Sequence, residues 1–152
     1  MRLDPIDQHN WRDAVAVRVS DEQLRFVAGH QPVALVILAK AYVRVGDLEW
    51  EPLAIVNDLG VVGVLALAHA GSRTELQHLA IDVARQGQGY GSAAVERALV
   101  HVAASRPDAL AVWLTVHPDN APAQRLYRKA GFAPTGEISE GEPVWSRTVE
   151  RS

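Results

Sequence analysis

A glycine-rich segment carries the clearest chemical signal in this chain: Gln86-Gly87-Gln88-Gly89-Tyr90-Gly91-Ser92, between a predicted strand and a predicted helix. Glycine lets the backbone bend tightly and approach a ligand closely, so that successive N–H groups can surround an anion. The N-terminus of the following helix adds partial positive charge at the same place. The segment therefore predicts a binding site for phosphate groups.

Two common phosphate-binding motifs do not fit this loop. A P-loop requires Lys followed by Ser or Thr, and no Lys follows Gly91. A dinucleotide-binding loop has Gly or Ala where this chain has Ser92, and an acidic residue about 20 positions later, where this chain has Ala111. Two alternatives stay open from the loop alone: a plain strand–helix turn without a ligand, and some other nucleotide-binding module.

Hydrophobic spacing and turn residues predict the elements that hold this loop. Helices are expected over residues 11–19 with Asn10 as N-cap, and over 20–29, 32–43, 92–105 and 121–130. Strands are expected over residues 2–6, 51–57, 61–69, 73–83 and 109–116, and the rest of the chain is expected to be extended. This order predicts an α/β fold of the mixed α+β kind, with helices packed on a mixed sheet.

Two segments resemble the GNAT superfamily of N-acetyltransferases. Leu79-Ala80-Ile81-Asp82-Val83 followed by Gln86-x-x-Gly89-x-Gly91 resembles its pyrophosphate-binding motif, and Asn120-x-x-Ala123-x-x-Leu126-Tyr127-x-x-x-Gly131-Phe132 resembles its other signature segment. The resemblance implies a single GNAT domain over residues 1–152, with a mostly antiparallel central sheet, a splayed parallel strand pair and helices on both faces.

The same resemblance implies acetyl-CoA as co-substrate. Pantetheine is expected along the backbone of the first splayed strand, the pyrophosphate in the glycine-rich loop, and the cofactor arm beside an asparagine after the second splayed strand. The residues expected to bind acetyl-CoA are Leu79, Ile81, Val83, Gln86, Gly87, Gln88, Gly89, Tyr90, Gly91, Ser92, Asn120 and Tyr127.

Two residues are expected to move protons. The resemblance makes Tyr127 the acid that protonates the leaving thiolate; the alternative is an aromatic side chain that only packs its helix. An alkylamine must lose a proton before it attacks, at a cost of about 4 kcal/mol at pH 7. Glu75 matches a glutamate that acts as base through water in some relatives, and a solvated carboxylate is its alternative. His78 and His117 are further candidates for the base.

Strand alternation gives a further expectation around Glu75. It places Glu75, Gln77 and Leu79 on one face of their strand and His78 on the other.

The ends of the chain resemble bacterial spermine and spermidine acetyltransferases. The matching segments are Asn10-Trp11-Arg12, Val19-Ser20-Asp21-Glu22-Gln23, Phe26-Val27-Ala28, and Gly136-Glu137-Ile138 with Glu140-Gly141-Glu142. A polyamine is therefore the leading acceptor, with carboxylates expected to offset its charge. Those carboxylates are Asp21, Glu22, Glu75, Glu137 and Glu140. Three alternatives remain: another amine such as an antibiotic, an amino acid or a peptide N-terminus; a non-catalytic acyl-CoA-binding module; and, for each carboxylate singly, an ordinary surface charge.

Composition limits the chemistry further. The chain has 152 residues, no cysteine and a net charge of −3. Without a thiol to carry an acyl group, direct attack in a ternary complex is expected. No metal is expected, because no histidine has a second histidine three or four positions away.

The expected partner is a small-molecule amine. The chain has no basic stripe for nucleic acid. Its longest apolar run, residues 32–39, is far below the ~20 residues of a membrane span, so a cytoplasmic protein without a membrane partner is expected. A homodimer is one option by analogy with the superfamily.

Overall fold

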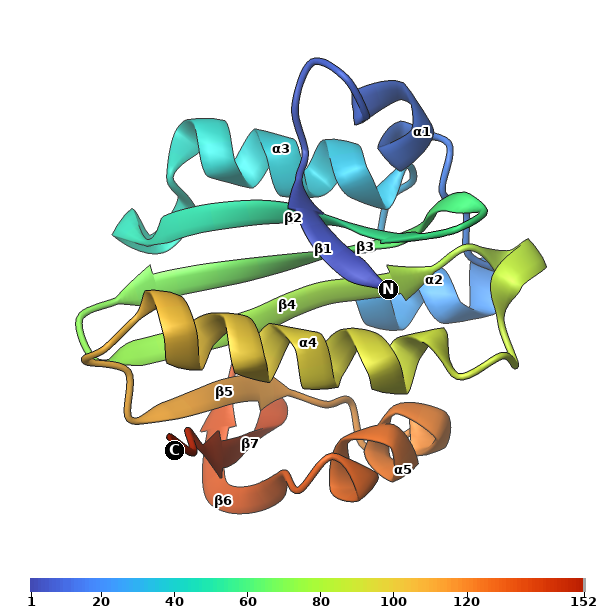
Figure 1. Cartoon of the computed structure of the whole chain (residues 1–152). Coiled ribbons are helices and arrows are strands. Elements are labelled where there is room, and N and C mark those ends of the chain that lie inside the picture. The colour runs from blue at the N-terminus through green and yellow to red at the C-terminus, as the bar shows by residue number, and fades with distance from the viewer. Residues whose placement is uncertain (152) are drawn as a thin grey trace.

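Seven strands form one mixed sheet. The computed structural model describes residues 1–151. Its strands are β1 (Arg2–Pro5), β2 (Glu49–Asn57), β3 (Gly60–Ala70), β4 (Arg73–Ile81), β5 (Ala111–Thr115), β6 (Ala133–Ser139) and β7 (Glu142–Thr148). They lie in the order β1-β2-β3-β4-β5-β7-β6, and every neighbouring pair is antiparallel except β4 and β5 (Figure 1). The expected mixed sheet with one parallel strand pair is confirmed.

Helices pack on this sheet. They are α1 (Trp11–Val15), α2 (Asp21–Val27), α3 (Val33–Val43), α4 (Tyr90–Ser105) and α5 (Ala121–Lys129), with short 3-10 turns η1 (Val45–Asp47) and η2 (Val83–Arg85). Figure 1 shows α4 in front of β4 and β5, and α3 beside β2.

Helix α1 ends four residues before the predicted end of 19, so that prediction was too long. Asn10 also does not cap it with its side chain, which instead accepts from the Asp7 N–H at 2.9 Å. The chain extends after α1 because Arg18 pairs with the end of β4: the Arg18 N–H donates to Asp82 at 2.9 Å, and the Val83 N–H donates to the Arg18 carbonyl at 2.7 Å.

Alternating side chains of the central strands supply two hydrophobic cores. On β3, Leu65 and Leu67 face the core under α4, whereas Val64 and Ala66 face the core under α1 and α3. All four side chains are fully buried. Burial of apolar side chains on both faces of the same strands is the main force that holds this sheet in place.

The parallel pairing between β4 and β5 is short. It joins only Arg73, Thr74 and Glu75 to Ala111, Val112 and Trp113. Beyond Glu75 the two strands have no paired residues, and a cavity opens between them. This arrangement is the splayed strand pair that was expected.

A β-bulge interrupts β4 just beyond this fork. The register joins Gln77 to Ala66 and Ala80 to Val64, so His78 and Leu79 together oppose the single residue Leu65. His78 takes a left-handed conformation, with φ of 58°. Leu76 and Leu79 both pack with the α4 core, so Glu75 and Gln77 lie on the opposite face together with His78, which contacts α2 and α3. The expected alternation, which grouped Leu79 with Glu75 and Gln77, is therefore wrong.

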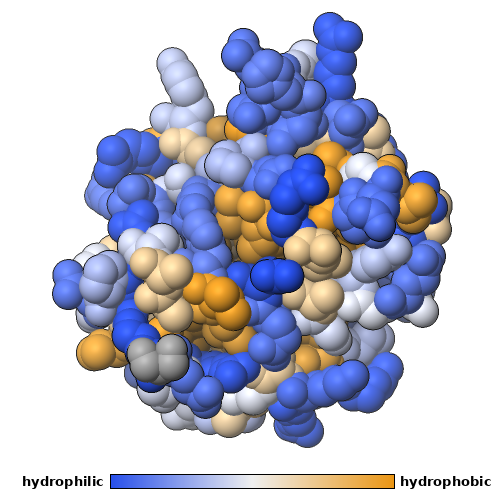
Figure 2. Space-filling view, in the orientation of Figure 1, coloured by the Kyte–Doolittle hydropathy of each residue, from blue (hydrophilic) through white to orange (hydrophobic). Residues whose placement is uncertain are grey.

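The surface seen from the side of α4 is mostly hydrophilic. Figure 2 shows its apolar residues in small separate patches rather than in one continuous area. Among residues 1–151, no helix has both the length and the apolar character needed to cross a bilayer.

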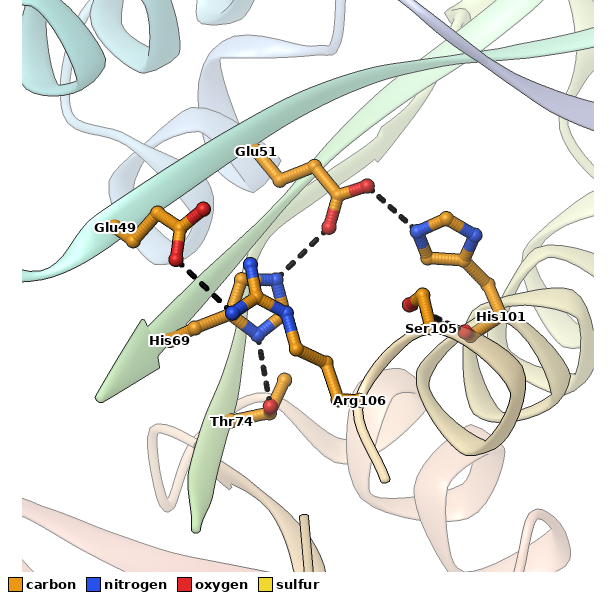
Figure 3. A network of polar contacts seen from close by, with 7 residues as sticks. All are labelled: Glu49, Glu51, His69, Thr74, His101, Ser105 and Arg106. Atoms are coloured by element: carbon orange, nitrogen blue, oxygen red, sulfur yellow. Dashed lines mark hydrogen bonds and ion pairs between the residues drawn. The ribbon is translucent and has the colours of Figure 1, made fainter. Parts of the chain in front are cut away.

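A polar network with His69 and Thr74 buried at its centre and its other members partly or fully exposed lies between the sheet and the second half of α4 (Figure 3). The Glu51 carboxylate accepts hydrogen bonds from His69 Nε2 at 2.8 Å and from His101 Nε2 at 2.6 Å. Because Nε2 of a neutral His69 then carries the proton, its Nδ1 accepts from the Thr74 hydroxyl at 2.8 Å. Next to it, Arg106 pairs with Glu49 at 2.9 Å. The network ties β2, β3 and β4 to α4.

We expect Glu51→Gln to destabilise the fold by about 2 kcal/mol at neutral pH, because a Gln amide cannot accept from both imidazoles. Burial raises the pKa of Glu51, but the hydrogen bonds from His69 and His101 outweigh it and leave the pKa lowered. A carboxylate with a lowered pKa in the folded state stabilises the protein above its ordinary pKa, and this contribution is lost as pH falls through the folded value. The difference between wild type and variant should therefore shrink below about pH 4.5.

Urea unfolding followed by circular dichroism at pH 7 and pH 4 measures this difference. Glu49→Gln is the matched control, since that carboxylate is exposed and has one cationic partner, and it should cost less. Equal stability of the wild type and Glu51→Gln at pH 7 would contradict the role of the network.

Candidate active site

One cavity of about 450 Å³ lies where β4 and β5 separate, within the range typical of small-molecule sites. Its walls come from α2, β4, the glycine-rich loop, the end of β5 and α5, with Glu142 from the start of β7. The lining residues used below are Gln23, Phe26, Gln77, His78, Leu79, Ile81, Arg85, Gln86, Gly89, Tyr90, Thr115, His117, Asn120, Tyr127 and Glu142. Segments far apart in the sequence therefore meet around one hollow.

The glycine-rich loop forms one end of this cavity. Gly89 has φ of 84°, a conformation that side chains disfavour, and no atom lies within 4 Å of the position a Cβ would take. Gly91 has a different reason: a Cβ there would lie 2.9 Å from Leu126 Cδ1, so glycine lets α4 pack against α5. No side chain caps the first turn of α4, whose N–H groups are left to meet an anion. Arg85 adds a cation to the same wall.

The Gln86 side chain fixes this loop to two neighbours. Its amide donates to the Ile81 carbonyl at 2.9 Å and to Gln23 at 2.9 Å, and the Gln23 amide donates back at 3.0 Å. Gln23 stands in α2, where it also closes the capping box with Ser20. The loop and α2 are thus held together on the rim of the cavity.

Tyr127 and Asn120 contribute from α5. Asn120 is the N-cap, and its side chain accepts from the Ala123 N–H at 3.3 Å. The Tyr127 ring meets Phe132 edge-on, with centroids 5.7 Å apart. Burial raises the pKa of Tyr127 to about 12, so its hydroxyl stays protonated at neutral pH and can donate a hydrogen bond into the cavity.

Glu75 lies at the fork, one residue before the cavity wall. Its carboxylate accepts from the Gln77 amide at 2.9 Å, and Gln77 itself lines the cavity. The other oxygen lies 3.4 Å from Arg73 Nε. The hydrogen bond from Gln77 places the Glu75 carboxylate beside the cavity wall, a position that suits a base acting through an intervening water.

The two histidines in the wall are less suited to accept a proton. Both ring nitrogens of His78 have partners: Nδ1 donates to the Val27 carbonyl at 2.7 Å, so Nε2 accepts from Lys40 at 2.9 Å. Burial lowers the pKa of His78. The hydrogen bond to Val27 raises it and the charge of Lys40 lowers it, and the pKa remains below its ordinary value. His117 Nδ1 accepts from the Asp119 N–H at 3.0 Å, so its Nε2 carries the proton in the neutral form.

Most residues expected to bind acetyl-CoA do line the cavity, but two do not. Val83 lies in η2, where its N–H is already bonded to the Arg18 carbonyl, and it is 52% exposed. Gln88 is exposed and is absent from the described lining. The short turn η2 ends the strand at Ile81, which carries Val83 away from the position that a continuous strand would give it.

The carboxylates expected to meet a polyamine are not in the cavity wall. Asp21, Glu22, Glu137 and Glu140 are all exposed. Glu140 is nevertheless close enough to Lys40 to oppose, by its charge, the lowering of the Lys40 pKa by burial. Among residues 1–151, Glu142 is the acidic residue that lines the cavity.

Sequence reasoning missed several residues of the wall. Phe26 reaches across from α2, and its ring lies 5.0 Å from the His117 ring at the end of β5. Arg85 stands next to the loop motif, so its position was a usable signal. Phe26 belongs to a segment that resembles polyamine acetyltransferases, but the sequence did not place its ring in the cavity wall, because that depends on how α2 crosses the fork.

The donor set fits acetyl-CoA. Backbone N–H groups, Arg85 and an uncapped helix end suit a pyrophosphate, and the unpaired stretch of β4 suits an extended arm such as pantetheine. Within the described part of the chain, no group of three or more His, Asp or Glu side chains is placed to hold a metal ion.

Comparisons with solved structures agree on the fold. A spermidine N-acetyltransferase from Vibrio cholerae, solved with CoA and spermine, superposes with a TM-score of 0.73 at 15% identity, over 97% of this chain and 94% of that one. An aminoglycoside acetyltransferase solved with coenzyme A superposes with a TM-score of 0.74 at 18% identity, over 97% of this chain and 94% of that one. An acetyltransferase of the GNAT family from Staphylococcus aureus superposes with a TM-score of 0.70 at 11% identity, over 98% of this chain and 99% of that one.

Sequence comparison identifies the family. A search of curated protein sequences finds no match. The model of the acetyltransferase (GNAT) family matches residues 31–132, more than half of the chain, and spans both the glycine-rich loop and Tyr127. This chain, with its forked sheet and its glycine-rich loop at the head of α4, belongs to the GNAT family of acetyltransferases.

Proposed function

We propose that this acetyl-CoA-dependent N-acetyltransferase acetylates a primary amine of a small molecule by direct attack in a ternary complex. The observation that carries the proposal is one continuous cavity that joins the glycine-rich loop to Tyr127 and to the fork beside Glu75. Both substrates can occupy such a space together. The chain has no cysteine to hold an acyl group between two half-reactions.

Acetyl-CoA, when bound, supplies an acetyl thioester as the activated group. The protein's part is to bind, orient and move protons. The Tyr127 hydroxyl holds a proton for the departing sulfur, and burial keeps that proton in place by raising the pKa to about 12. The backbone of the loop and the first turn of α4 hold the phosphates and fix the arm along β4.

The attacking amine must also lose a proton. Glu75 is the proposed acceptor, acting through a water molecule at the fork. His78 and His117 are less favoured, because their hydrogen bonds leave no lone pair free to receive the proton. The chemistry therefore needs a carboxylate on one side of the cavity and a protonated phenol on the other.

We expect Glu75→Gln to lower kcat/KM about tenfold at pH 7, and by less at pH 9, where more of the amine is already deprotonated. Initial rates of the wild type and the variant across pH 6.5–9.5 measure this. A constant ratio of the two rates over the whole range would remove Glu75 as the base.

The acceptor is proposed to be a polyamine, on the resemblance of both ends of the chain to polyamine acetyltransferases. Glu142 in the cavity wall supports a cationic acceptor, because it can pair with an ammonium group. The exposed positions of Asp21, Glu22, Glu137 and Glu140 give the proposal no support from those residues. Another amine, such as an aminoglycoside, is the second candidate acceptor, since Glu142 would serve it equally.

Thiol release from acetyl-CoA tests the proposal, with spermine, spermidine, aminoglycosides, amino acids and short peptides offered in turn. Initial rates are measured against acetyl-CoA at several amine concentrations. Intersecting lines in the double-reciprocal plots support direct attack in a ternary complex, and parallel lines would refute it. Turnover with aminoglycosides alone would keep the reaction and discard the polyamine. Tight binding of acetyl-CoA without turnover on any amine would favour a non-catalytic acyl-CoA-binding module.

A further inference from the structure

Three side chains form a small shelf on the sheet at the fork of β4 and β5: Arg73, Glu75 and Trp113. The Arg73 guanidinium lies 4.3 Å above the centre of the Trp113 ring. Its Nε lies 3.4 Å from Glu75 Oε1. The Arg73 and Glu75 side chains are 43% and 29% exposed, so the shelf is open to solvent.

The shelf continues the cavity along the sheet. Glu75 and Trp113 are the last paired residues of β4 and β5 before the gap opens. The next residues on the same face of the two strands are Gln77 and Thr115, and both line the cavity. Gln77 also donates to Glu75 Oε2, which connects the cavity wall to the shelf directly.

An aromatic face beside a carboxylate is a receptor for a cation. Here the chain's own Arg73 occupies that receptor. We propose that the shelf binds a second cationic group of the acceptor, which takes the place of the Arg73 guanidinium between Trp113 and Glu75. The inference rests on the proposed function, because it assumes that the reacting amine occupies the adjoining cavity.

Exchange of the two cations is physically reasonable. Contacts of half-exposed guanidinium groups with aromatic rings and carboxylates are weak, so an incoming ammonium can displace Arg73 without disrupting the fold. Glu75 Oε1 pairs with Arg73, while Oε2 accepts from Gln77. The shelf can therefore hold a cation on one oxygen while the other oxygen stays directed to the cavity. The acceptor class is a linear di- or polyamine.

The test compares spermidine, which has further ammonium groups, with n-hexylamine, which has one. In Trp113→Leu, the ratio of KM for spermidine to KM for hexylamine should rise about fivefold, through the loss of the aromatic face. In Arg73→Gln the same ratio should fall, because the internal competitor is gone. The chain offers a matched control: Arg12 lies over Trp11 at 5.3 Å on the exposed surface, so Trp11→Leu and Arg12→Gln should leave the ratio unchanged.

Equal effects of Trp113→Leu on both amines, or none on spermidine, would overturn the shelf. Failure of the proposed function looks different: the wild type would then acetylate neither amine although acetyl-CoA still raises its melting temperature. Calorimetric titration of spermidine into the protein saturated with CoA decides the matter in that case. Binding that Trp113→Leu weakens supports the shelf, and no binding to the wild type refutes it.

Discussion

Gly89→Arg should abolish acetyl-CoA binding. Gly89 faces open space at the phosphate end of the cavity, so a side chain there would project where the pyrophosphate is expected. A bulky side chain would also stand in front of the N–H groups at the start of α4. We expect affinity for acetyl-CoA to fall at least 100-fold, which corresponds to about 2.7 kcal/mol.

The melting temperature measures this result most directly. Acetyl-CoA at 100 times its dissociation constant should stabilise the wild type by about 2.7 kcal/mol, equivalent to about 5–10 °C in a chain of this size. The same concentration should raise the melting temperature of Gly89→Arg by no more than about 1–2 °C. Turnover should be lost in parallel, because the arm is no longer fixed along β4.

A matched variant separates this effect from backbone strain. Gly136 has φ of 89°, close to the 84° of Gly89, and likewise has no atom within 4 Å of a Cβ position. It lies in β6, outside the cavity lining. Gly136→Arg should therefore show the same loss of stability without ligand, but keep the full stabilisation by acetyl-CoA. If Gly89→Arg also kept that stabilisation, the assignment of the loop would be wrong.

The sequence predicted the parts of this fold that local patterns determine. Alternation predicts the hairpin of β2 and β3, apolar spacing predicts helix α3, and glycine predicts the loop before α4. The observed ends of β2, β3 and α3 lie within two residues of the predicted ends. Helix α1 is shorter than predicted because Arg18 pairs with Asp82, 64 residues away. No periodicity within residues 11–19 carries that information.

The bulge at His78 shows the same limit at the site. One extra residue in β4 shifts the faces of all the residues that follow, and it depends on the register with β3. A histidine at φ of 58° gives no signal in the sequence, where glycine would have done so. Its hydrogen bonds to Val27 and Lys40 hold the ring in place from two other elements. The spacing of residues in the sequence therefore could not show which histidine can act as a base.

The same reasoning applies to the acidic residues. Asp21, Glu22, Glu137 and Glu140 were chosen by resemblance and by charge, and a charge alone does not say whether a side chain faces a cavity or solvent. The structure leaves them exposed, and brings Glu142 into the wall because β7 begins beside the end of β5. Trp113 and Arg73 come together through the β4–β5 register, across 40 positions of sequence.

Tyr127→Phe should lower kcat about 100-fold and leave the dissociation constant of acetyl-CoA unchanged. The substitution removes one hydroxyl group and keeps the ring that packs against Phe132, so the fold should be unaffected. A phenol with a pKa of about 12 is a weaker acid than an ordinary thiol, by roughly 3.5 units or about 5 kcal/mol. Tyr127 should thus act by hydrogen bonding to the sulfur as its charge develops, and the coenzyme leaves as a thiolate that takes its proton from water.

The pH dependence follows from the raised pKa. Because the hydroxyl stays protonated until about pH 12, wild-type kcat should show no loss from ionisation of Tyr127 up to pH 10. Single-turnover rates of the wild type and Tyr127→Phe, with melting temperatures of both, separate chemistry from packing. Tyr42→Phe is the control, since Tyr42 is 91% exposed on α3 and should match the wild type. An unchanged kcat in Tyr127→Phe would leave this residue a packing role only, and a lower melting temperature alongside lower kcat would point to a structural cause.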